Sequence, residues 1–446
     1  MVAVRSIPAA VNQVLTDAAT GCGASNWVKV EVKDDGAVWQ DLTNLESVDW
    51  ILNYEKNRSV DNQLATATVT LKLRDGELNL SPLMTTSKIN ATNTVVDVWH
   101  QIRISTATMP HMVKPLSGDY YRVFNGYILN IDMSQADTMK LTCGDDGALL
   151  DATYIEEVRN YGTAAGRAVE TVLQDILTDW PGGVTLQVSA ATGATFTTYP
   201  QKREPVLNAI RNLAHQIGWD VKYKWWTGAG GPDYELVLFE PDRALSGYGG
   251  GATDIDYTKN DFINGPKIVI SATDVRNKIK GVYTNSANGS ARDDEDVKDD
   301  PSIAKYGTRF MEISEDSSSR IDTSAEMTTF LNSALNDLKD PTAIVTGAVP
   351  YNAFLELNDV VGLTADDFHF DTNQRLALYA ITDSVQNGGH GVSRLTLRGN
   401  PTVGVRTHLD KQIVYDEVSS GGRNVNLGSS KTGNTAPNYN LGDLDW

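Results

Sequence analysis

The stretch that decides the fold runs from Ile344 to Gly399. It begins with IVTGAVPYNAFLELNDVVGLT and ends with RLALYAITDSVQNGGHGVSRLTLRG. The pattern predicts one strand that ends at Pro350 and a second strand over Phe354–Leu363. Apolar and polar residues then alternate over Arg375–Gln386, and an Asn-Gly-Gly turn leads into a partner strand at Val392–Arg398. The block therefore predicts an antiparallel β-structure near the end of the chain.

The length and composition indicate a soluble protein with several domains. A chain of 446 residues exceeds what one hydrophobic core usually supports, so we expect two to four domains. Hydrophobic residues make up 41% and charged residues 21%, which is a globular balance. No apolar run approaches the ~18 residues of a membrane helix. Polar residues interrupt the N-terminal stretch, so we expect no secretory signal there.

The net charge argues against nucleic-acid binding. A chain with a formal charge of −19 repels the phosphates of a nucleic acid, because nucleic-acid binding depends on clustered lysine and arginine. The best basic and aromatic grouping is Lys222 and Lys224 beside Trp225 and Trp226, and one strand face explains it without a nucleic acid. Two cysteines, Cys22 and Cys143, form neither a disulfide framework nor a closed zinc site. Free thiols suit a protein that folds in a reducing cytoplasm.

The N-terminal third predicts an arm and then a β-barrel. Residues 1–26 are small and polar, as expected of an N-terminal arm. Residues 27–152 are expected to form a first β-barrel, because apolar and polar residues alternate and turns separate short segments. The strands expected there include Ala65–Leu73, Val95–Ile104, Tyr120–Ile131 and Thr138–Thr142.

The middle third changes to a helical period. Residues 153–266 predict an α+β region, with an alternative split into two subdomains near residue 200. Apolar residues recur every three or four positions over Ala165–Trp180 and over Pro205–Ile217, which predicts two helices. Strands are expected at Trp219–Trp226 and Tyr234–Glu240.

The last third predicts a second β-barrel and a tail. Residues 267–402 are expected to form this barrel with an inserted helix, which starts at a capping box of Thr323 and Glu326 and ends before Pro341. Residues 403–446 are rich in glycine, serine and asparagine and are expected to form an extended C-terminal tail. Trp446 is a candidate docking anchor in that tail.

The order of these segments resembles that of phage tail-tip or baseplate hub proteins, a family related to the hubs of contractile tails and of secretion spikes. Three stretches carry the resemblance: the strand with Phe124, Gly126 and Ile128 followed by Asp145; TDVRNKIKGVYT over Thr273–Thr284; and the block quoted above. The resemblance extends over residues 27–402. It implies a mainly β fold with an α+β middle, in which two β-barrel domains flank α/β subdomains.

The resemblance also implies an assembly role. Hub proteins form homotrimers in which two barrels per subunit make a ring of six, matching a hexameric tail. The expected partners are hexameric distal tail or tail-tube proteins, the tape-measure protein, and receptor-binding or spike and fibre proteins. The expected location is the tail tip of the virion, after synthesis and assembly in the host cytoplasm. The ring would enclose the DNA-ejection channel, and the acidic charge would keep contacts with DNA weak.

The alternatives are an enzyme and a different kind of hub. A tail-associated peptidoglycan or glycan hydrolase would need two carboxylates facing each other, and the neighbours Glu156-Glu157 or Asp145-Asp146 seldom do so. A secretion-type spike hub is disfavoured, because no repetitive needle segment is present. We therefore expect no enzyme activity and no catalytic, cofactor, metal or nucleic-acid site.

Three further groups have a functional and a simpler interpretation. The acidic stretch Ala291–Pro301 lacks the glycine and terminal glutamate of an EF-hand, which favours a solvated loop over a calcium site. His369 lies near Asp366, Asp367 and Asp371 but lacks a second histidine, which favours a surface loop. Trp225 and Trp226 would face opposite sides of a strand, one in the core and one at a protein contact.

Overall fold

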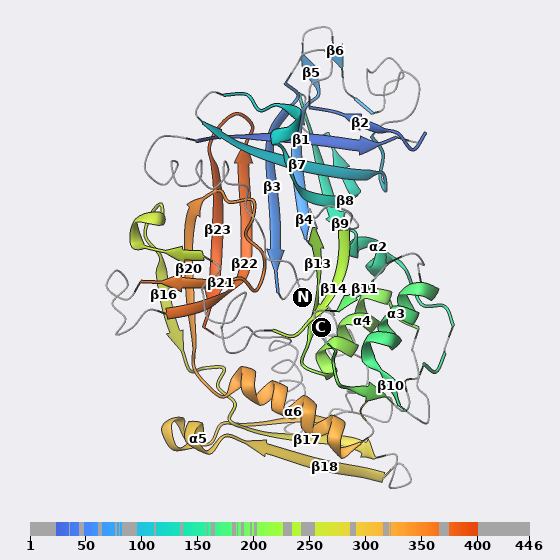
Figure 1. Cartoon of the computed structure of the whole chain (residues 1–446), viewed down its shortest axis with the longest axis vertical. Helices are drawn as coiled ribbons and strands as arrows, with labels where there is room; N and C mark the ends of the chain where they lie inside the picture. Colours follow the sequence, from blue (N-terminus) through green and yellow to red (C-terminus); the bar gives the residue numbers. More distant parts are fainter. Residues whose placement is uncertain are drawn as a thin grey trace, which may run out of the picture. The chain divides into compact units, whose positions relative to one another are not determined.

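A computed structural model describes residues 24–34, 36–43, 49–60, 65–75, 78–79, 81–82, 96–110, 113–133, 137–157, 159–161, 166–180, 184, 186–188, 191–196, 199, 203–225, 234–241, 255–285, 291–314, 321, 323–364 and 374–399. The described part is mostly β with few helices, as the sequence predicted. It divides into two compact units (Figure 1). One unit holds the described residues up to Asp274 and from Asp340 onwards, and the other holds Val275–Lys339.

The first unit is organised around one large sheet. Its main path runs in the order β16-β20-β23-β22-β3-β4-β9-β8-β7-β1-β2, with β15 and β21 joined at the side. The strands from the N-terminal region are β1 (Ala24–Lys33), β2 (Trp39–Asp41), β3 (Ile51–Ser59), β4 (Thr66–Lys72), β7 (Gln101–Pro110), β8 (Tyr121–Asp132) and β9 (Thr138–Asp145). Those from the C-terminal region are β15 (Ile255–Tyr257), β16 (Lys267–Ser271), β20 (Thr342–Pro350), β21 (Val360–Leu363), β22 (Gln374–Gln386) and β23 (Gly391–Arg398). Both β-rich regions therefore share one sheet.

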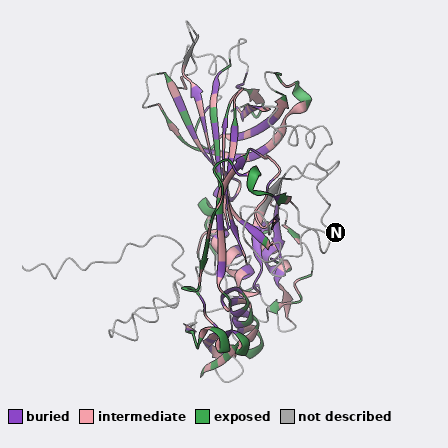
Figure 2. Ribbon diagram, turned by 90° about the vertical axis from the view of Figure 1, so that its left-hand side faces the viewer, coloured by how far each residue is buried: buried purple, intermediate pink, exposed green. Residues whose placement is uncertain are grey.

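Alternation along the strands creates the core of the N-terminal half. In β1, Val28, Val30 and Val32 are buried, while the lysines and glutamate between them are only partly covered. Figure 2 shows this alternation of buried and more exposed positions along the sheet. Tyr351 and Val385 come from the C-terminal region and are nevertheless buried in the same core. The N-terminal half is thus completed by residues that lie far away in the sequence.

A bulge in β22 lies where this strand changes its pairing partner from the C-terminal to the N-terminal half. Residues 374–377 of β22 pair with β21, whereas residues 380–386 pair with β3. The register shifts between Leu378 and Ala380, and the backbone N–H of Val60 donates to the carbonyl of Tyr379 at 3.0 Å. A bulge bends a strand and increases its twist, so it suits the point where β22 changes partner.

The turn between β22 and β23 closes the N-terminal half. The side-chain oxygen of Asn387 accepts the backbone N–H of Val28 in β1 at 3.0 Å, and its amide donates to the carbonyl of Ile51 in β3 at 3.2 Å. Gly388 occupies the left-handed region with a φ of 71° and donates its N–H to the carbonyl of Asn26 at 2.7 Å. One turn therefore links β1 and β3, which are not neighbours in the strand order of the N-terminal series.

Asn387→Ala is expected to lower the free energy of unfolding by about 2–4 kcal/mol, because it leaves a backbone donor in β1 and an acceptor in β3 without their partners. Chemical denaturation of the full chain measures the change. Asn53→Ala serves as the control, because Asn53 is exposed on β3 and its replacement should stay within about 0.5 kcal/mol. Equal effects of the two replacements would contradict this account of the turn.

The middle region forms the predicted α+β structure. Its helices are α2 (Gly147–Ala152), α3 (Val169–Asp179) and α4 (Val206–Gln216), and its strands are β10 (Arg167–Ala168), β11 (Leu186–Val188), β12 (Thr195–Phe196), β13 (Asp220–Trp225) and β14 (Tyr234–Phe239). The apolar stripes predicted for the two longer helices are buried in one core with residues of β13 and β14. Pro205 precedes α4 and Gly218 follows it with a φ of 71°, as their sequence positions predicted.

The second unit combines one sheet and one long helix. It contains β17 (Lys278–Asn285), β18 (Ala291–Lys298), β19 (Phe310–Ser314), α5 (Asp300–Tyr306) and α6 (Ser324–Leu338). The predicted capping box is present, since Thr323 accepts the N–H of Glu326 at 3.2 Å and Glu326 accepts that of Thr323 at 3.2 Å. The buried face of α6 packs with apolar residues of β17 and β19.

Three local predictions are wrong. The strand expected at Val95–Ile104 begins only at Gln101, because residues 96–100 contain a turn. Residues 291–298 of the acidic stretch are not a loop but the strand β18, which pairs with β17 along its whole length. The expected strand Phe354–Leu363 is reduced to β21, because residues 351–359 form turns stabilised by their own polar side chains. The short remaining elements are β5 (Arg74–Asp75), β6 (Leu78–Asn79), η2 (Ser117–Asp119) and η3 (Lys259–Asp261).

Candidate functional site

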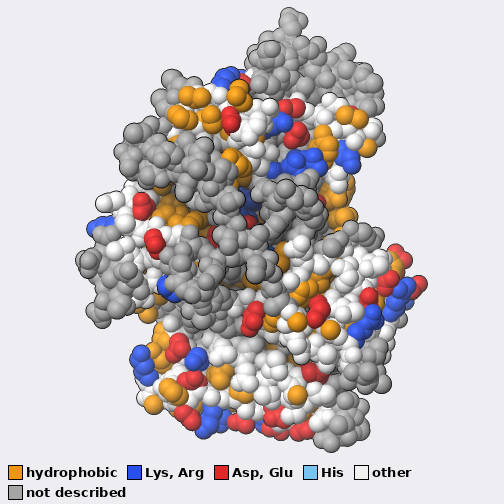
Figure 3. Space-filling model, viewed as in Figure 1, with side chains coloured by type: hydrophobic (Ala, Val, Ile, Leu, Met, Phe, Trp, Pro, Cys, Tyr) orange, Lys and Arg blue, Asp and Glu red, His pale blue; other side chains and the backbone are white. Residues whose placement is uncertain are grey.

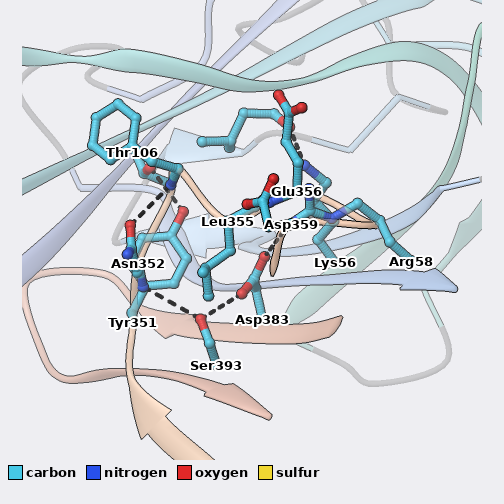
Figure 4. Close-up of polar contacts among 12 residues, drawn as sticks. Lys56, Arg58, Thr106, Tyr351, Asn352, Leu355, Glu356, Asp359, Asp383 and Ser393 are labelled. Carbon is cyan, nitrogen blue, oxygen red and sulfur yellow. Dashed lines mark hydrogen bonds and ion pairs between the residues drawn. The ribbon is translucent and has the colours of Figure 1, made fainter. Parts of the chain in front are cut away.

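The joint between the two halves of the large sheet gathers several buried polar side chains, among them Lys56, Asp383 and Ser393. We call it the seam and define it as the β3–β22 strand pair with the segment Tyr351–Asp359 that lies against it. Lys56 of β3 lies directly opposite Asp383 of β22 in the register. Figure 4 shows the side chains that meet there from β3, β7, β22, β23 and the 351–359 segment.

Asp383 is the anionic centre of the seam. Arg58 donates from Nη2 to Asp383 Oδ2 at 3.2 Å, and Ser393 donates from Oγ to Asp383 Oδ1 at 2.6 Å. Arg58 also donates from Nη1 to the carbonyl of Leu355 at 2.9 Å. The Asp383 side chain is only 3% exposed, so this ion pair is desolvated. Removing one partner of such a pair is expected to be far more costly than removing an exposed pair.

Lys56 is a second cation in the same place. It is buried, and its ammonium donates to the backbone carbonyl of Val123 in β8. Burial lowers the pKa of Lys56 to about 7, and the positive charge of Arg58 adds to the effect. The carboxylates of Asp383, Glu356 and Asp145 act in the opposite direction.

The 351–359 segment ties three regions together. The hydroxyls of Tyr351 and Thr106 of β7 lie 2.9 Å apart. The carboxylate of Asp359 accepts the backbone N–H of Glu356 at 2.7 Å. Lys222 of β13 donates to the carbonyl of Leu357 at 3.2 Å and lies 3.8 Å from a Glu356 carboxylate oxygen. The segment therefore contacts the N-terminal half, the C-terminal half and the middle region.

The main path of the sheet ends at two strands that pair on one side only within the described residues, and β15 on the side branch likewise pairs only with β21. Of the two ends, β2 pairs only with β1 and β16 pairs only with β20 in those residues. The β16 edge carries apolar side chains that water reaches, since Val269 is 42% exposed and Ile270 is 67% exposed. Native proteins usually protect such edges with charges, bulges or proline, so an apolar edge indicates a contact surface.

The two pairs of neighbouring acids considered for hydrolysis lie in different surroundings. Asp145 is buried and accepts the N–H groups of Ala65 at 2.9 Å and Gly147 at 3.0 Å. Burial raises the pKa of Asp145 to about 7 and also raises the pKa of Asp146, which accepts a hydrogen bond from Asn125 at 3.0 Å. These bonds give Asp145 a structural role at the end of β9.

The structure describes only some of the other residues that the sequence analysis named. Glu156 and Glu157 are exposed, and Glu157 forms an ion pair with Arg159 at 3.0 Å. Cys143 is free and buried, and burial raises its pKa. The following lie outside the described residues: Cys22, Trp226, His369, Asp366, Asp367, Asp371, Trp446, the arm up to residue 23 and the tail from residue 400; the side chains of Lys224 and Trp225 are not described either.

The described ranges contain no group of three histidine, cysteine or acidic residues arranged to hold a metal ion. Among the helices in those ranges, none has the length and apolarity needed to cross a membrane. On the face drawn in Figure 3, acidic and basic side chains are interspersed among the described residues. That view shows no continuous basic surface of the kind that duplex DNA requires.

Comparison of the fold with solved structures defines its class: the chain has the fold of phage tail proteins, as the sequence resemblance predicted. The tail protein from Neisseria meningitidis MC58 has a TM-score of 0.53 at 13% identity, covering 83% of this chain and 96% of that one. The 43 kDa tail protein of prophage MuSo2 from Shewanella oneidensis gives 0.53 at 14% identity, covering 84% and 98%. Prophage tail protein gp18 from Listeria monocytogenes EGD-e gives 0.54 at 14%, covering 86% and 99%.

No protein-family model matches the chain, and no curated protein matches it either. At these identities the structural likeness establishes the fold, and the role of the chain is argued separately below.

Proposed function

We propose that this chain is a non-enzymatic structural protein of a phage tail tip, where three copies form the hub ring that joins the tail tube to the adsorption apparatus and encloses the DNA-ejection channel. Its partners would be hexameric distal tail or tail-tube proteins, the tape-measure protein, and receptor-binding or spike and fibre proteins. It would be synthesised and assembled in the host cytoplasm and would act in the virion.

One observation carries the proposal. The two β-rich halves lie on a single sheet whose described ends, β2 and β16, are both open. A head-to-tail contact between such ends repeats from subunit to subunit and closes into a ring when the rotation allows it. Three subunits with two β-rich halves each would then present six similar surfaces to a six-fold tail. The fold shared with three tail proteins supports the same role.

The first test is the mass of the purified full-length protein at micromolar concentration. A ring of three copies predicts three times the subunit mass of 48.5 kDa. A stable assembly with another number of subunits would contradict the trimer. An assay on purified peptidoglycan tests the non-enzymatic part of the proposal, and cleavage that depends on this chain would refute it.

Ile270→Lys is expected to weaken self-association. A lysine on the β16 edge places a charge in the proposed contact, and hot-spot losses at interfaces are about 2–4 kcal/mol, which is roughly 30- to 1,000-fold in each dissociation constant. Sedimentation over a concentration series measures the change. Leu116→Lys is the matched control, because Leu116 is 76% exposed and lies outside the edge strand. Unchanged association of both variants would exclude β16 as the contact.

A further inference from the structure

The inward face of β3 carries polar groups whose bonding is incomplete. Tyr54, Lys56 and Arg58 follow each other at every second position and therefore point to the same side of the sheet. The hydroxyl of Tyr54 is fully buried, and no described residue forms a hydrogen bond with it. The same holds for Nε of Arg58. Each such buried group destabilises the folded state, because water satisfies it in the unfolded chain.

The carboxylate that faces Lys56 forms its hydrogen bonds with other residues. Asp383 faces it across the strand pair, but the two oxygens of Asp383 are bonded to Arg58 and Ser393. The only hydrogen bond found for the Lys56 ammonium among the described residues is the one to the Val123 carbonyl. An ammonium has three donors. A buried lysine in this position is therefore under-satisfied.

The β4–β9 strand pair, which is separated from the seam by the β3–β4 pair, is built differently. Across β4 and β9 the inward register pairs are Ala67 with Cys143, Val69 with Leu141 and Leu71 with Met139, all of them buried. Apolar pairs of this kind stabilise a sheet without any demand for hydrogen bonds. The inward face is therefore apolar at the β4–β9 pair, whereas at the seam it carries polar groups that lack some of their hydrogen bonds.

We propose that the seam is the weakest strand pair of the first unit: the two halves separate between β3 and β22 more readily than either half opens internally. Lys56 is the residue that lowers the stability of this strand pair. Opening at this joint also releases the bonds of Asn387 to β1 and β3 and of Tyr351 to Thr106, while the β4–β9 pair stays formed. The proposal concerns the subunit alone and holds whether or not three copies form a ring.

The electrostatics of the seam agree with this assignment. The charged groups that face Lys56 are Arg58 on its own strand, Asp383 on β22, Glu356 on the 351–359 segment and Asp145 on β9. With its pKa lowered to about 7, the ammonium is charged at and below neutral pH, where the seam is least stable. Above neutral pH the folded seam holds a neutral amine instead.

The test is amide hydrogen exchange of the full-length protein at pH 7, compared between wild type and Lys56→Met. Wild-type amides that bond across the seam, within residues 53–59 and 380–386, should exchange at least 10-fold faster than those between β4 and β9. Lys56→Met should slow the seam amides by 10-fold or more and leave the β4–β9 amides nearly unchanged. Lys140→Met, at an exposed position of β9, should change neither set.

Tyr54→Phe provides an independent variant, because it removes the unpartnered hydroxyl and keeps the ring. It should slow seam exchange by about 3- to 10-fold, and it keeps the test decisive if Lys56→Met fails to fold. Equal slowing of all strands would show a general gain in stability and would overturn the proposal. Seam amides as slow as the β4–β9 amides in the wild type would overturn it as well.

Discussion

Lys56→Met is expected to raise the free energy of unfolding by about 2–4 kcal/mol at pH 7, and denaturant titration of the full chain measures the change. A fall in the pKa of Lys56 from 10.5 to about 7 corresponds to a penalty of about 5 kcal/mol for holding the charge in the folded state. Methionine keeps most of the apolar stem and removes the charge, but it leaves the Val123 carbonyl without its donor. Replacing buried ions by apolar residues has this sign and size elsewhere.

The gain should depend on pH in a definite direction. The unfolded chain binds a proton at Lys56 up to about pH 10.5, whereas the folded chain loses it above about pH 7. Wild-type stability therefore rises with pH between these values and is flat with respect to this group below pH 7. The difference between Lys56→Met and wild type should be largest at and below pH 7 and should shrink towards pH 10. A difference that grows with pH would refute this assignment.

Asp145 has the opposite linkage. Its pKa rises from 3.8 to about 7, so the folded chain binds the extra proton between these values and loses stability as pH rises through them. The two groups together place a minimum of stability near neutral pH. Comparison with Lys140→Met, which changes only an exposed lysine, separates the seam from the general titration of the protein.

Gly126→Ala is expected to destabilise the protein by about 3–5 kcal/mol. A Cβ at this position would lie 2.0 Å from the Gly144 carbonyl oxygen and 2.7 Å from Cα of Asp145. Both atoms belong to the backbone of β9, so no side-chain rotation relieves the clash and the β8–β9 pair must separate locally. Effects of this size come from overpacking or strain at special positions.

Thermal denaturation of the variant measures the effect, and Gly118→Ala is its control. Gly118 is another glycine of the N-terminal half, and a Cβ there would meet nothing within 4 Å. Its replacement should change stability by less than about 0.5 kcal/mol. A Gly126→Ala variant as stable as Gly118→Ala would show that the two strands do not approach as closely as described.

Periodicity predicted most of the regular structure. The alternation over Arg375–Gln386 and the Asn-Gly-Gly turn are found as β22 and the start of β23, and the apolar stripe ahead of Gly218 is found as α4. These signals are local, since the side-chain period of 2 or 3.6 reports which face is buried. The need for a glycine at position 126 is not a periodic signal, because it arises from the close approach of the β9 backbone.

The seam could not be predicted, because its strand resembles a solvated one. The segment Tyr54–Arg58 reads YEKNR, and lysine or arginine at alternate positions normally indicates a face in water. The burial of Lys56 and the partial burial of Arg58 accompany pairing with β22, which lies more than three hundred residues away. Likewise, the acidic residues of β18 obscured its strand character, because strand propensity depends on the partner that it meets.

The link between Val28 and Asn387 joins positions 359 apart in the sequence. A ribosome releases the N-terminal strands long before it makes the turn that closes them, so the growing chain carries an incomplete half through most of its synthesis. Contacts of such separation form late and slowly, and until then exposed strands invite wrong partners. The order of translation thus makes the last described strands, β22 and β23, the ones that complete the N-terminal half.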